Sequence, residues 1–232
     1  MERRRRTVPR PAVLLACAAA VPALLIAGCS SGSGSGSKDA TASASGSASP
    51  TPTLAPERFT TLPDACKTVT KATVTALVPK TKSLSGTETQ TSDIKARGGC
   101  SWTGNGKDGY QYRWLSVSME RYSSSTALGS AEDQAKKRYA AEVASLGKAP
   151  GFTAAPVTGV GDEASSVGGK ATVAKVTSQN GTVVTRTGNV VLIVEFNGAG
   201  LEGKKNPTAQ TVQSGAQRAA KDALSAVAAA NA

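Results

Sequence analysis

From about residue 59 onward, apolar residues recur with two different spacings. In three segments they lie three or four positions apart, which predicts amphipathic helices. These segments start at a polar residue suited to cap a helix and end where the pattern is broken. The first runs from Asp64 to about Leu77, the second from Ser125 or Thr126 to about Leu146, and the third starts at Asn206-Pro207.

Between these segments, apolar and polar residues alternate as they do in strands. Two strands are predicted on either side of a glycine-rich turn, and four shorter strands follow the second helix: 98–103, 110–122, 158–166, 170–178, 181–187 and 189–197. Asn180-Gly181 and Gly188-Asn189 are typical hairpin turn pairs. The sequence therefore predicts an α+β domain, with an antiparallel sheet of about six strands and three helices packed on it.

The first 56 residues do not fit this pattern. Residues 1–10 are strongly basic and residues 11–27 are apolar, which is typical of a signal peptide. A transmembrane helix is the alternative, but it would need about 20 apolar residues. Residues 30–56 consist mostly of Ser, Gly, Ala, Thr and Pro, and predict a disordered tether. We therefore expect a signal peptide at 1–28, an anchored tether at 29–56 and an extracytoplasmic domain at 57–232.

The signal peptide ends in Leu25-Ile26-Ala27-Gly28-Cys29-Ser30. This segment resembles the lipobox of bacterial lipoproteins. The resemblance implies cleavage after Gly28, diacylation of Cys29 and attachment to the outer face of the cell membrane, where two acyl chains suffice for stable anchoring. Arg5-Arg6 only loosely resembles a twin-arginine signal, so both export routes stay open.

The four cysteines then divide by position. Cys17 lies in the signal peptide and Cys29 is the expected anchor, which leaves Cys66 and Cys100 in an oxidising compartment. We predict a disulfide between them. A metal site would need two more soft ligands, and the sequence offers none, so no metal or other cofactor is expected.

Short motifs also carry a family resemblance. Pro63-Asp64-Ala65-Cys66, Cys100-Ser101-Trp102, the segment 159–164 and the apolar strand 188–194 together resemble a family of actinobacterial lipoproteins built on a domain of unknown function. The resemblance implies a surface lipoprotein and an α-β-α sandwich similar to PsbP. It implies no activity.

The composition excludes several classes of catalytic site and partner. The chain has no histidine, which excludes Ser-His-Asp and Cys-His catalysis and histidine-ligated metals. From Cys29 onward, 22 basic and 15 acidic residues are scattered without a long basic run, so no nucleic-acid partner is expected. Asp162 and Glu163 are adjacent in a predicted strand and should point to opposite faces, and Thr68-x-x-Lys71 lacks companion motifs. We predict no catalytic residues and no enzymatic activity.

Aromatic residues are the remaining candidates. Trp102 is expected to pack on the disulfide. Tyr110, Tyr112 and Trp114 alternate on the strand face opposite Leu115. If the helices leave their face open, these three are candidate ligand contacts; a covering helix or a neighbouring strand would explain them equally well. The sequence favours a non-catalytic binding or accessory lipoprotein with an envelope lipid, glycan or protein as partner. The alternatives are a sensor or docking module for a membrane protein and, less favoured, a hydrolase.

Overall fold

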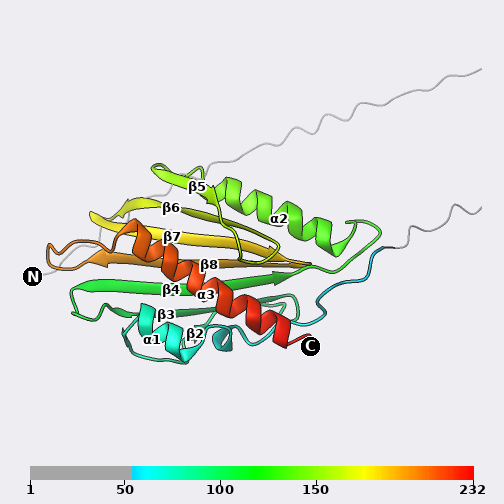
Figure 1. Cartoon of the computed structure of the whole chain (residues 1–232), viewed down its shortest axis with the longest axis horizontal. Coiled ribbons are helices and arrows are strands. Elements are labelled where there is room, and N and C mark those ends of the chain that lie inside the picture. The colour runs from blue at the N-terminus through cyan, green and yellow to red at the C-terminus, as the bar shows by residue number, and fades with distance from the viewer. Residues whose placement is uncertain (1–53) are drawn as a thin grey trace, which may run out of the picture. The chain divides into compact units, whose positions relative to one another are not determined.

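The computed structural model describes residues 54–232, which form one antiparallel sheet with helices on it (Figure 1). The predicted signal peptide, Cys29 and the part of the predicted tether up to residue 53 lie outside the described residues. The predicted α+β class is confirmed. The sheet has eight strands rather than about six. Five long strands correspond to the six predicted ones, and two two-residue strands and one five-residue strand were not predicted.

The elements follow one another in the order two short helices, four strands, a helix, four strands and a final helix. Their bounds are η1 Ala65–Lys67, α1 Lys71–Leu77, β1 Lys80–Thr81, β2 Thr87–Glu88, β3 Arg97–Asn105, β4 Gln111–Arg121, α2 Ala131–Leu146, β5 Phe152–Pro156, β6 Glu163–Val173, β7 Val176–Thr187, β8 Val190–Gly200 and α3 Ala209–Ala229. The strand order is β1-β3-β4-β8-β7-β6-β5, with β2 also paired to β3. No helix among these residues is long and apolar enough to cross a membrane.

The helices cover both faces of the sheet. Alternate residues of β8 show this directly: Leu192, Val194 and Phe196 belong to the core under α3, whereas Val191 and Ile193 pack with Tyr139 and Val143 of α2. The short helix α1 lies on the α3 face, at the near side in Figure 1. The layers are therefore helix, sheet, helix.

One hairpin prediction is confirmed and the other is wrong. Gly188 and Asn189 form the turn between β7 and β8, and Gly188 has a φ of 51°. Asn180-Gly181 instead lies inside β7, and the β6–β7 turn falls at Ala174-Lys175, both with positive φ. Gly181 serves a packing need, because a Cβ there would lie 2.8 Å from the backbone carbon of Val212 in α3.

This change moves the strand boundaries. The predicted strand 170–178 spans the β6–β7 turn, and the predicted strand 158–166 begins five residues early. Residues 158–162 form a turn in which Gly159 and Gly161 have positive φ, which agrees with the expectation of a turn or bulge. The four strands predicted after the second helix therefore correspond to three long strands, β6, β7 and β8. The remaining strand of this part, β5, lies just before them in the chain and was not predicted.

Hydroxyl and amide side chains also shift the helix starts. The first predicted helix is divided, because Thr70 is extended and its side chain accepts a hydrogen bond from the amide of Thr73. The second helix begins after Ser130, and Ser125 closes a separate turn with Gly129. The third is capped by Thr208; Asn206 instead links the end of β8 to β7 by accepting from the amide of Gly200 and donating to the carbonyl of Thr177.

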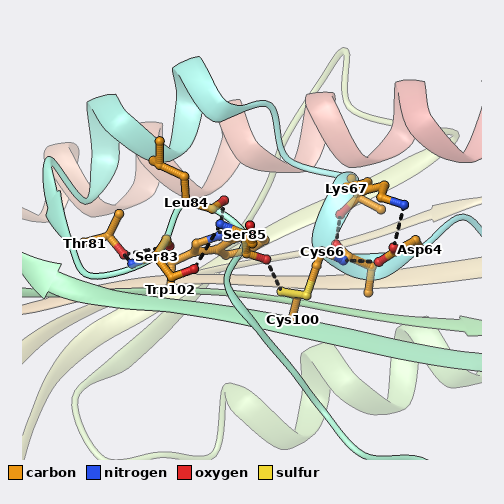
Figure 2. Close-up of a disulfide and its surroundings, with 11 residues drawn as sticks. Asp64, Cys66, Lys67, Thr81, Ser83, Leu84, Ser85, Cys100 and Trp102 are labelled. Atoms are coloured by element: carbon orange, nitrogen blue, oxygen red, sulfur yellow. Dashed lines mark hydrogen bonds and ion pairs between the residues drawn. A yellow bond between two sulfur atoms is a disulfide. The ribbon is translucent and has the colours of Figure 1, made fainter.

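The predicted disulfide joins η1 to β3, with 5.0 Å between the Cα atoms of Cys66 and Cys100 (Figure 2). Trp102 lies beside it and is buried, as expected of a core residue, and its indole Nε1 donates to the carbonyl of Leu84 at 3.2 Å. Gly86 has a φ of 71°, and a Cβ there would lie 2.5 Å from Cys100 Sγ. The loop before β2 is therefore fitted closely over the disulfide and the indole.

The chain enters the domain along a short extended segment, Glu57–Thr61, which we call the entry strap. The buried Asn189 side chain accepts from the amide of Phe59 and donates to the carbonyls of Phe59 and Tyr122. Glu57 pairs with Arg121 at the end of β4 at 3.1 Å. Asn231, just after α3, accepts from the amides of Thr60 and Thr61. The strap thus joins the start of the domain to its C-terminal end.

Candidate functional site

The two aromatic residues inside β4 lie on a part of the sheet that α2 leaves open. Tyr112 and Trp114 are 40% and 43% exposed, although they lie on the same face as α2. That helix packs on β6, β7 and β8 and leaves this end of β4 uncovered. The structure therefore places these two candidate contacts on a solvent-exposed sheet surface, even though helices cover both faces.

The strand register surrounds the two rings with polar side chains. Trp114 lies between Thr103 of β3 and Asn197 of β8, and Tyr112 lies beside Asn105. Further along β4, the Ser116 hydroxyl donates to Glu195 at 3.1 Å. We call this set the aromatic surface: Tyr112, Trp114, Thr103, Asn105, Ser116, Glu195 and Asn197. It combines two flat apolar rings with hydroxyl, amide and carboxylate groups that can form hydrogen bonds.

The third predicted contact has a different environment. Tyr110 precedes β4, and the ammonium of Lys204 lies 4.7 Å from the centre of its ring. Tyr110 is also exposed. A cation held over one ring face is a favourable contact in itself, so we treat Tyr110 as a neighbour of the aromatic surface and not as part of it.

Where α2 begins to cover the sheet, the aromatic surface ends in a charged cluster. Arg138 of α2 donates to Glu120 of β4 at 2.8 Å and also binds Glu142, and the Tyr122 hydroxyl donates to Glu120 at 2.7 Å. Burial would raise the pKa of Glu120, but the hydrogen bonds from Arg138 and Tyr122 outweigh it and hold the pKa below its ordinary value. Burial and the Glu120 carboxylate raise the pKa of Tyr122 to about 12.

This cluster predicts a pH-dependent contribution to stability. A carboxylate with a lowered pKa in the folded state stabilises above its unfolded pKa, about 4.3, and this stabilisation is lost as the pH falls through the folded value. We expect Glu120→Gln to lower the free energy of unfolding at pH 7 by about 1 kcal/mol, the order found for partly exposed charged hydrogen bonds. Urea unfolding at pH 7 and below pH 4 should show the difference shrinking in acid. A difference that is constant with pH would contradict this assignment.

A cavity of about 440 Å³ lies beside the disulfide, lined by residues that include Cys66, Val69 and Leu84. Several of its polar groups already have partners. Asp64 accepts from the amide of Cys66 and pairs with Lys67, and the Thr70 hydroxyl donates to Asp222. Because Asp64, Lys67 and Thr70 are engaged in these contacts, we place the candidate site at the aromatic surface instead.

The adjacent carboxylates of Asp162 and Glu163 do not diverge as predicted. Asp162 precedes β6, so strand alternation does not separate the two, and both approach the buried guanidinium of Arg186, at 3.6 and 2.7 Å. Asp162 also accepts from the amide of Gly188 and pairs with Arg58. Their role is to neutralise Arg186 and fix the β7–β8 turn. Thr68 is buried, with its hydroxyl bonded to the carbonyl of Ala65, which leaves it no role with Lys71.

Comparison of the chain with models of known protein families, with curated proteins and with solved structures finds no match. Within residues 54–232, no group of three or more Cys, Asp or Glu side chains is placed to hold a metal ion. The geometry of the described residues is therefore the basis for a functional proposal.

Sequence reasoning found the two rings but missed their polar neighbours. Thr103, Glu195 and Asn197 come from β3 and β8, and only the register of those strands against β4 brings them beside Trp114 and Ser116. In 195–197 polar residues alternate with a buried apolar one, which indicates that Glu195 and Asn197 share a face. The alternation does not indicate that this face lies next to Trp114.

Proposed function

We propose that this chain is a non-catalytic, lipid-anchored binding protein of the cell envelope, and that the aromatic surface contacts a glycan. The observation that carries the proposal is the exposure of Tyr112 and Trp114 on an open sheet surface beside polar side chains. The lipid anchor at Cys29 and the location on the outer face of the membrane are parts of the proposal that rest on the sequence.

A glycan suits this surface better than a lipid or a protein. A sugar ring has an apolar face of C–H groups that can lie on an aromatic ring, and hydroxyls around its edge that need hydrogen-bond partners. The neighbours of Trp114 supply such partners in Thr103, Asn197 and the Ser116–Glu195 pair. A lipid or a protein hot spot would favour a larger continuous apolar patch.

Tryptophan fluorescence offers a direct test, because the chain has two tryptophans and one of them is buried. In a Trp102→Phe variant, Trp114 is the only tryptophan reporter. We expect envelope polysaccharide, added to the full chain in detergent, to shift the emission of Trp114 to shorter wavelength as the ring leaves water. Native mass spectrometry of the envelope-expressed protein should show the same glycan as a non-covalent adduct.

The binding variants are Trp114→Ala and Tyr112→Ala, each expected to weaken glycan binding about tenfold or more, as removal of a central aromatic contact does. Leu128→Ala is the matched control, because Leu128 is an exposed apolar residue in the turn before α2. A lipid adduct, or a protein partner captured by crosslinking through Trp114, would replace the glycan in this proposal. Glycan binding that survives both aromatic substitutions would place the site elsewhere.

A further inference from the structure

One arginine in the described residues is half-buried yet has no polar partner. Arg113 of β4 points to the α3 face, opposite the aromatic surface, and its side chain makes no hydrogen bond or ion pair with any residue from 54 to 232. Its Nη1 is fully shielded from solvent. By contrast, the buried Arg186 is surrounded by carboxylates. A shielded guanidinium with no carboxylate hydrogen-bonded to it is costly unless something else pairs with it.

The surroundings of Arg113 hold the guanidinium in place. It lies over the ring of Phe196, 5.8 Å from the ring centre. On the neighbouring strand, Gly198 leaves the space that Nη1 occupies: a Cβ there would lie 3.0 Å from Nη1 and 2.7 Å from Cγ of Pro207. Burial lowers the pKa of Arg113, and Asp108 only partly opposes this. The side chain is thus positioned by packing rather than by a partner charge.

Two cavities meet at this side chain. One of about 160 Å³ and one of about 440 Å³ share Gly106, Lys107 and Arg113 in their linings. The smaller has apolar walls from Leu77, Pro79 and Phe196. Arg113 therefore lies between an open mouth and a small apolar pocket.

Basic residues outnumber acidic ones in the linings of these two cavities. Lys107 lines both, and the Lys80 ammonium lies 3.1 Å from where a Cβ on Gly109 would be. The start of α3 also contributes, since Thr211 in its first turn lines the smaller cavity and no acidic residue occupies that turn. Asp108, whose carboxylate accepts from the amide of Tyr110, is the acidic residue in the lining.

We propose that Arg113 anchors a second ligand site, which takes a carboxylate bonded to a small aliphatic group. The carboxylate would pair with the guanidinium, helped by Lys107 and the start of α3, and the aliphatic group would occupy the apolar pocket against Phe196 and Leu77. The end of a peptide with a small last residue has this chemistry. The site lies on the opposite face from the aromatic surface and does not depend on a glycan binding there.

The test is an NMR titration of the full chain in detergent with N-acetylalanine. We expect the amide signals of Gly106, Gly198 and Thr211 to shift together as the ligand binds. N-acetylalaninamide, which lacks the charge, should cause no such shifts. Inorganic phosphate should bind more weakly than N-acetylalanine, because it has no group for the apolar pocket.

Arg113→Gln should weaken binding of N-acetylalanine at least about tenfold, the scale of one charge-assisted hydrogen bond. Arg97→Gln removes the same charge from an exposed position on β3 and should leave binding unchanged. In ligand-free buffer, Arg113→Gln should unfold at the same or a higher temperature than the parent chain, because an unpaired charge is removed. If Arg113→Gln fails to fold, Arg113→Lys retains a charge but lacks the planar fork, and weaker binding is expected from it too.

Three results would overturn the proposal. One is equal binding of the acid and the amide. Another is binding of N-acetylalanine that Arg113→Gln or Arg113→Lys does not weaken. The last is binding of phosphate as tight as that of N-acetylalanine, which would reduce the site to a general anion site. None of these results bears on Trp114, so the glycan proposal stands or falls separately.

Discussion

Replacement of Cys66 and Cys100 by alanine is expected to lower the free energy of unfolding by about 3 to 4 kcal/mol. The bond closes a loop between residues 34 positions apart, and a loop of that length contributes about this much in the chain-entropy model. The measurement is chemical unfolding of the parent chain and the double variant under oxidising conditions.

Reduction of the parent chain supplies the control, because it removes the crosslink but keeps both sulfur atoms in the packing. The reduced parent chain should lose most of the same stability, and reductant should not affect the double variant. If the double variant loses less than about 1 kcal/mol, the disulfide is not a main source of stability, and the contacts of Trp102 would have to hold the loop before β2 instead.

Trp102→Ala is expected to cost about 3 to 5 kcal/mol, the usual range for removal of a large buried ring. The indole is 1% exposed, packs beside the disulfide and binds the carbonyl of Leu84. Trp102→Phe keeps an aromatic ring and loses that hydrogen bond, so a loss of about 1 kcal/mol from the bond is expected, plus the cost of the smaller ring.

Trp114→Ala provides the matched comparison, because it removes the same side chain from an exposed position. It should change stability by about 0.5 kcal/mol or less. Thermal and urea unfolding of the three variants would measure these differences. Equal losses for Trp102→Ala and Trp114→Ala would contradict the division into a structural and a surface tryptophan. The losses from Trp102→Ala and from the cysteine double variant should not add, because the two sites touch.

Local patterns gave the fold class, the disulfide and the β7–β8 hairpin, because each depends on residues whose chemistry is specific. They gave a wrong turn where a glycine is required by tertiary packing. Gly181 looks like a turn residue after Asn180, but it is needed for the close approach of α3 to β7. The real β6–β7 turn uses Ala174 and Lys175 in the left-handed region, which neither residue favours.

The two candidate sites also differ in how far a local sequence pattern could predict them. The alternation of Tyr112 and Trp114 is visible along one strand, so their shared face could be predicted. The lack of a partner for Arg113 could not be, because it depends on which side chains β8, α1 and α3 bring to that place. Arg113 is one of two arginines in β4, and its position between Tyr112 and Trp114 gives no signal of its own.

The entry strap and the two candidate sites lie at opposite ends of β4. It is fastened at Arg121, where β4 ends, whereas Tyr112 and Arg113 lie near the start of that strand, nine and eight residues earlier. At the usual rise of a strand this is about 30 Å. The chain before Glu57 therefore joins the domain at the end of β4, whereas the two candidate sites lie near the start of β4. Under the proposed membrane anchor, neither surface lies at the end of the domain where the anchored chain enters it.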